Sequence, residues 1–124
     1  MAVARTAIIT EKDLLRLGAE DRRVEVIDGE LVPMAPVGFL HAMVAGNVYR
    51  ALYAYATAHR LGYVAGDSLI YVLLHDPEAG IRRTRIPDVS FIRKGRLPED
   101  FDLARPFPGA PDLAAAFAAK DGTL

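Results

Sequence analysis

The sequence predicts an α/β or α+β domain in which a central mixed β-sheet is flanked by helices. Short runs rich in Val, Ile and aromatic residues, which are typical of strands, are separated by Gly and Pro turns. Between residues 40 and 59, in contrast, apolar residues recur at helical spacing over a length unusual for a strand. The 124 residues fit one domain, which we expect to span residues 1–124.

Two helices are expected in the first half of the chain. Thr10 followed by acids at positions 11 and 13 predicts an N-cap and the start of a short helix, which Gly18 should end. A long helix should run from about Leu40 to His59, with Gly62 after it. Its apolar stripe consists of Leu40, Val44, Val48, Leu52 and Tyr55.

A hairpin is the clearest local feature. The pair Asp28-Gly29 separates two β-prone runs and favours a type I′ turn, because glycine adopts positive φ without strain. Alternation along the first strand places Val24 and Val26 on one face, and Glu25 and Ile27 on the other. Further strands are expected at residues 63–64, 68–74, 81–86 and 89–92.

The last third of the chain is less regular. Residues 93–109 contain three prolines and two glycines and are predicted to form a loop. The tail, residues 110–124, is rich in alanine, which favours helices and is depleted in strands. Local propensity therefore argues against a strand in the tail.

Composition narrows the functional classes. The chain contains no cysteine, which excludes disulfides and thiolate metal sites and is compatible with a reducing cytoplasm, the location that we expect. Residues 31–49 lack charge, but Pro33, Pro36 and Gly38 interrupt them, so no membrane span is predicted. A net charge of −1 gives the whole molecule no long-range attraction to nucleic acid.

Basic residues gather around a single acid between residues 81 and 96. Asp88 is the only carboxylate there, and the surrounding cations are Arg82, Arg83, Arg85, Arg93, Lys94 and Arg96. One interpretation is a phosphate-contacting rim around a functional carboxylate. The other is a solvated strand face and loop, since short basic runs are common on protein surfaces.

The order of these motifs resembles the Uma2 group of restriction-endonuclease-like proteins, which are built on the PD-(D/E)XK nuclease core. The resemblance rests on RRVEVIDGELVPMAPVGFLHAMVAGNVYRAL, then RIPDVSFIR, then APDLA. It covers roughly Thr10 to Leu113. Each motif is common by itself, whereas their order and spacing together are fairly specific.

The resemblance implies metal-assisted hydrolysis of phosphodiesters, with Mg²⁺ or Mn²⁺ held by carboxylates. It assigns Asp88 to the Pro-Asp motif, Glu25 to the hairpin glutamate and His41 to the helix-opening histidine. Asp88 and Glu25 would be metal ligands, and all three would be catalytic. Each has a structural alternative: Asp88 as a turn residue, Glu25 as a solvated strand residue, and His41 as a packed side chain.

The chain departs from the family pattern after Pro111-Asp112-Leu113. The resemblance calls for a glutamate where Ala116 stands and a lysine where Ala118 stands, while Lys120 is displaced by about 7 Å along a strand. Relatives also continue further, so the C-terminal part of the core is expected to be missing. A change of reading frame and an artificial chain end would both explain this departure.

Three functions therefore compete. The first is a Mg²⁺-dependent endonuclease of the Uma2 type that acts on DNA and is weak or inactive in this chain. The second is a non-catalytic module for nucleic-acid binding or assembly that keeps the nuclease fold. The third is a truncated chain without activity. DNA contacts are expected through the six basic residues around Asp88, and a homodimer is possible.

Overall fold

The computed structural model describes residues 8–117, which divide into two compact units. The first unit comprises the described residues before Pro36 together with Ile70–Ile86 and Leu103–Ala110. The second comprises Pro36–Leu69, Pro87–Asp102 and the described residues from Pro111 onward. The single domain expected over residues 1–124 stays a prediction.

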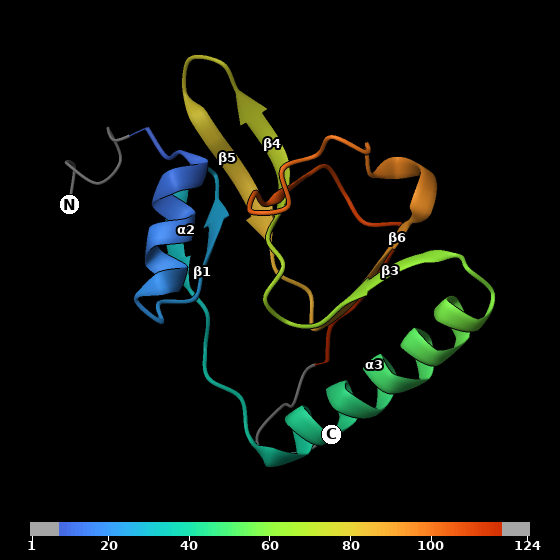
Figure 1. The fold of residues 1–124 in the computed structure, drawn as a ribbon. Coiled ribbons are helices and arrows are strands. Elements are labelled where there is room, and N and C mark those ends of the chain that lie inside the picture. Colours follow the sequence, from blue (N-terminus) through green and yellow to red (C-terminus); the bar gives the residue numbers. More distant parts are fainter. Residues whose placement is uncertain (1–7, 118–124) are drawn as a thin grey trace. The chain divides into compact units, whose positions relative to one another are not determined.

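The fold class is α+β, as predicted, but hydrogen bonding divides the strands of the described region among three small sheets. One sheet is the hairpin of β1 and β2, and a second has the order β3-β6-β8. The third has the order β5-β4-β7 and is the mixed one, because β7 (Phe107–Pro108) runs parallel to β4. Figure 1 shows the course of the chain and labels β1, β3, β4, β5 and β6 of these sheets.

Helix α2 (Glu11–Ala19) begins as predicted. The Thr10 hydroxyl accepts a hydrogen bond from the Asp13 amide, and the Asp13 carboxylate accepts one from the Thr10 amide. The bond from the Thr10 amide lowers the pKa of Asp13 below its ordinary value. Gly18 does not end the helix, which continues to Ala19 with Glu20 as its C-cap.

The predicted hairpin is present, with β1 (Val24–Ile27) paired to β2 (Glu30–Pro33). Asp28 and Gly29 both have positive φ, 51° and 78°, as a type I′ turn requires. A Cβ at Gly29 would meet only the guanidinium of Arg82, the flexible end of a side chain that can move aside. The positive φ of Asp28 and Gly29 therefore specifies this turn locally.

A buried threonine links the hairpin to the rest of the first unit. Strands β4 (Tyr71–Asp76) and β5 (Gly80–Arg85) form an antiparallel pair, and the Thr84 hydroxyl on β5 accepts a hydrogen bond of 2.9 Å from the Val26 amide. Around this link the apolar core of the unit consists of Ile9, Leu14, Leu17, Val24, Val26, Val72 and Ile81.

In the second unit, helix α3 (Phe39–Ala58) packs against β3 (Gly62–Ala65) and β6 (Val89–Arg93) (Figure 1). Its centre matches the predicted stripe, since Val44, Val48 and Leu52 are partly buried. The prediction is wrong for the two ends of the stripe, because Leu40 is 54% exposed and Tyr55 is 58% exposed. Neither described helix is long and apolar enough to cross a membrane.

Strand β8 (Leu113–Ala115) lies in the tail where local propensity argued against a strand. It pairs antiparallel with the central strand β6, in the register Phe91↔Leu113 and Val89↔Ala115. Pairing with β6 overrides the helical preference of alanine. The predicted loop at residues 93–109 is also interrupted, by the 3₁₀ turn η1 (Lys94–Arg96) and by β7.

Candidate functional site

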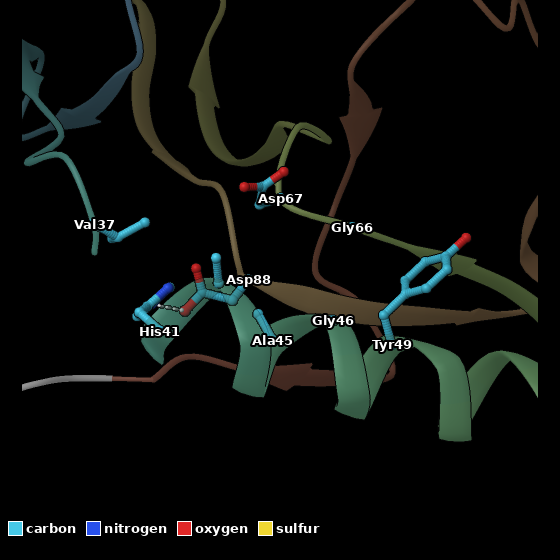
Figure 2. A pocket seen from close by; sticks show the side chains of 9 residues that line it. Val37, His41, Ala45, Gly46, Tyr49, Gly66, Asp67 and Asp88 are labelled. Atoms are coloured by element: carbon cyan, nitrogen blue, oxygen red, sulfur yellow. Dashed lines mark hydrogen bonds and ion pairs between the residues drawn. The ribbon is translucent and has the colours of Figure 1, made fainter. Parts of the chain in front are cut away.

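Asp88 and His41, 47 residues apart in sequence, form a hydrogen-bonded pair in the second unit. Asp88 immediately precedes β6, and His41 lies in the first turn of α3. His41 Nε2 is 3.2 Å from Asp88 Oδ2, and the two side chains are only 10% and 18% exposed. Two local motifs of the sequence are thus brought to one place (Figure 2).

Residues at the end of β8 and just beyond it also form hydrogen bonds with Asp88. The Phe117 amide donates to Asp88 Oδ2 at 2.8 Å, and the Asp88 amide donates to the Ala115 carbonyl at 3.1 Å. Oδ2 therefore receives two hydrogen bonds, whereas Oδ1 receives none from the described residues. Because both neighbours of Ala116 bond to Asp88, position 116 lies directly beside this carboxylate.

One ring nitrogen of His41 has no hydrogen-bond partner among residues 8–117. This atom is Nδ1, and it is buried. A carboxylate accepts hydrogen bonds, so Nε2 is the donor to Asp88. The ring also meets Phe117 edge-on, with centroids 6.2 Å apart. A buried polar atom without a partner is uncommon in proteins and points to a bound water or ligand group.

These two residues belong to the wall of a pocket of about 400 Å³ within the second unit (Figure 2). The pocket is lined by Val37, His41, Ala42, Ala45, Gly46, Tyr49, Gly66, Asp67 and Asp88. Asp67 and Tyr49 were not predicted. Asp67 follows β3 in a stretch without any motif, and Tyr49 is one of several tyrosines on α3, so only the folded chain reveals them.

The donor set suits a cation with few protein ligands. No group of three His, Cys, Asp or Glu side chains is placed to hold a metal among the residues that the structure describes. The pocket nevertheless presents two carboxylates, and Mg²⁺ is commonly bound by one or two carboxylates together with waters and phosphate oxygens. Asp67 and Asp88 are therefore the residues of this pocket that could hold such a cation.

Glu25, the other expected ligand, lies in the first unit. Its Oε2 accepts a hydrogen bond of 2.9 Å from the Ile86 amide, just beyond the end of β5. This contact gives the half-buried carboxylate a structural role in holding β1 beside β5. Its role as a metal ligand stays a prediction.

The six basic residues expected around Asp88 are divided between the two units. Arg93, Lys94 and Arg96 lie at the end of β6 that is opposite to Asp88. The other three belong to the first unit, where Arg82 covers the hairpin turn and the Arg85 side chain donates to the Thr84 carbonyl.

Asp112 is a second aspartate next to β6, and it lies at the end opposite to Asp88. It accepts a hydrogen bond of 2.7 Å from the Arg93 amide and forms an ion pair of 3.2 Å with Arg96. The Arg93 amide, and then the Arg96 side chain, hold the pKa of Asp112 below its ordinary value. Asp112 therefore does not take the place of the glutamate that the resemblance calls for at position 116.

Comparison with known proteins supports the resemblance. Residues 12–123 match the sequence model of the Uma2 family, described as "Putative restriction endonuclease". A search of curated proteins found no match. The match covers nearly the whole chain and includes the strand at Asp88, the histidine that opens α3 and strand β8. The chain therefore belongs to the Uma2 family.

Proposed function

We propose that the pocket at Asp88 and His41 is a nuclease-type site for metal-dependent hydrolysis of phosphodiesters in DNA, and that this chain cleaves very slowly or not at all. The family supports the chemistry, since a restriction-endonuclease-like protein acts on nucleic acid. The observation that carries the proposal is the position of Asp88, held at the start of β6 by His41 and by both neighbours of Ala116.

Each residue of the site has a role in this proposal. His41 and the Phe117 amide fix Asp88 through Oδ2, which orients the remaining oxygen, Oδ1, as a cation ligand. Figure 2 shows this oxygen on the pocket side of Asp88. A bound Mg²⁺ or Mn²⁺ would supply charge stabilisation for the phosphate and lower the pKa of a coordinated water. The pocket walls would limit access of bulk solvent to that water.

The expected weakness follows from position 116. In the family pattern a glutamate there would share the cation with Asp88, and the lysine two residues later would orient the nucleophile. Alanine supplies neither group, and each such loss typically costs on the order of a hundredfold in rate. The two losses do not add simply, because these groups act as a unit.

Restoring the glutamate tests the proposal. Ala116 is exposed and lies outside a helix, so Ala116→Glu should be tolerated by the fold. We expect it to raise Mn²⁺-dependent plasmid nicking at least about tenfold over the unaltered chain, short of full activity because the lysine is still missing. Nicking should vanish again in the double variant Ala116→Glu/Asp88→Ala.

A matched control variant distinguishes the effect of the position of the glutamate from the effect of its charge. Ala114→Glu introduces the same charge on the same strand, about 7 Å from position 116, and should give no gain. If Ala116→Glu nicks no faster than the unaltered chain, the site assignment is wrong. If the unaltered chain already cleaves rapidly and depends on Asp88, the expectation of weak activity is wrong.

DNA contacts remain part of the proposal. Arg93 and Lys94 are exposed in the second unit, so they are available to phosphates at one end of β6. Arg96 is engaged with Asp112 and is a poorer candidate. Because the chain is nearly neutral overall, any attraction to DNA must come from such local groups rather than from net charge.

A further inference from the structure

Asp67 lines the pocket together with Asp88 and His41, although it lies in none of the sequence motifs. It follows β3 by two residues, and β3 pairs with β6, the strand that Asp88 precedes. The register Ala65↔Ser90 therefore brings residues 67 and 88 to the same end of the sheet. Figure 2 shows the Asp67 side chain across the pocket from Asp88.

We propose that Asp67 is the second carboxylate of the cation site, and that it provides the negative charge which position 116 lacks. The inference rests on the proposed function, in which the Asp88 pocket holds a divalent cation. A single carboxylate leaves a dication largely unbalanced, whereas two carboxylates neutralise its charge. Two carboxylates and several waters are also a common set of ligands for Mg²⁺ in proteins.

An independent observation supports a hydrated ligand in this pocket. The His41 side chain is nine-tenths buried in the pocket wall, and its Nδ1 has no hydrogen-bond partner within the described residues. Buried polar atoms of this kind are rare unless a water or a ligand group completes their hydrogen bonds. With about 30 Å³ for each water in the liquid, a volume of about 400 Å³ has room for a cation and its waters.

Binding of the cation does not by itself restore cleavage. Asp67 lies after β3 rather than at the end of β8, so it approaches the cation from another side than the family glutamate would. It also brings no lysine to the nucleophile. A chain with this site is therefore expected to bind Mn²⁺ while nicking DNA slowly.

Calorimetric titration of the full chain with Mn²⁺, without nucleic acid, tests the role of Asp67. We expect one saturable site in the unaltered chain, weakened at least about tenfold in Asp67→Asn and in Asp88→Asn. Asp100→Asn removes the same charge from an exposed position outside the pocket, and it should bind as the unaltered chain does. Circular dichroism establishes that each variant is folded.

The outcomes separate this inference from the proposed function. If Asp88→Asn loses Mn²⁺ while Asp67→Asn keeps full affinity, Asp67 is not a ligand and the Asp88 site stands. If the unaltered chain binds no Mn²⁺, both ideas fail. Should Asp67→Asn not fold, Asp67→Ser replaces it in the same titration. A loss of Mn²⁺ affinity of at least about tenfold supports the inference, and full affinity overturns it.

Discussion

Two aspartates flank strand β6 and serve different purposes. Asp88, at the start of the strand, is held by a histidine and an amide and keeps one oxygen directed to a pocket. Asp112, near the other end, is committed to the Arg93 amide and to Arg96. Five residues of strand separate the two ends, roughly 16 Å. The same residue type therefore contributes to a candidate site at one end and to sheet stability at the other.

The role of Asp112 predicts a pH dependence of stability. Its pKa in the folded chain lies below the ordinary value of 3.8, mainly because of the Arg93 amide. A lowered folded pKa gives stability that is present above about pH 4 and is lost as the pH falls through the folded pKa. Asp112→Asn should therefore unfold at lower urea concentration than the unaltered chain at pH 7, with the difference shrinking below pH 4.

The control for this experiment is Asp100→Asn, an exposed acid of the same unit. Urea unfolding followed by circular dichroism should show no comparable pH-dependent difference for that variant. A stability difference in Asp112→Asn that stays constant from pH 7 to pH 3 would contradict the role assigned to the carboxylate charge.

How far the site could be predicted depends on how local its signals are. Pro87-Asp88 before an apolar strand and a histidine at the start of a long helix are local patterns, and both lie where the sequence placed them. The hydrogen bond between them spans 47 residues and is visible only in the fold. Asp67 could not be recognised from the sequence, because it comes to the same end of the sheet as Asp88 only through the register in which β3 pairs with β6.

At the scale of elements, tertiary pairing decides where local preference is weak. The hairpin at Asp28-Gly29 is fixed by backbone conformation within four residues, so the sequence predicts it well. Strand β8 consists of Leu113 and two alanines, which favour a helix in isolation. It becomes a strand because β6 offers hydrogen-bonding groups along its free edge. The burial predicted for the two ends of the α3 stripe was wrong for a similar reason. Helical periodicity shows which face of a helix is apolar, but it does not show how much of that face a packing partner covers.

The start of β3 depends on a glycine. Gly62 has a φ of +156°, and a Cβ there would lie 2.1 Å from the Ile92 carbonyl oxygen on β6. Gly62→Ala should therefore force β3 away from β6 and lower the free energy of unfolding by about 2 kcal/mol or more. Urea unfolding measures this loss. Gly66→Ala, just past the same strand, meets no atom within 4 Å and should change stability by less than about 0.5 kcal/mol.

Equal stability of the two glycine variants would contradict the close approach of β3 to β6. A large loss in Gly66→Ala alone would place the tight contact at the wrong end of the strand. Either result would also weaken the inference about Asp67, because its place in the pocket depends on the same pairing.

At the scale of the whole molecule, the two units are interleaved along the chain. Six segments alternate between them, so the chain passes from one unit to the other five times. Residues 70–86 of the first unit, for example, are joined at both ends to segments of the second. Folding of the second unit therefore shortens the loop that the first must close, which lowers its entropic cost.

This connectivity predicts that damage to one unit is felt in both. Gly62→Ala acts in the second unit, yet the amides of β4 and β5 in the first should exchange with deuterium faster as well. A loss of about 2 kcal/mol corresponds to roughly thirtyfold faster exchange for amides that open only by global unfolding. Hydrogen exchange with mass spectrometry compares the two units in one experiment. Faster exchange confined to residues 36–69 and 87–102 would mean that the units unfold independently in spite of their interleaved chain.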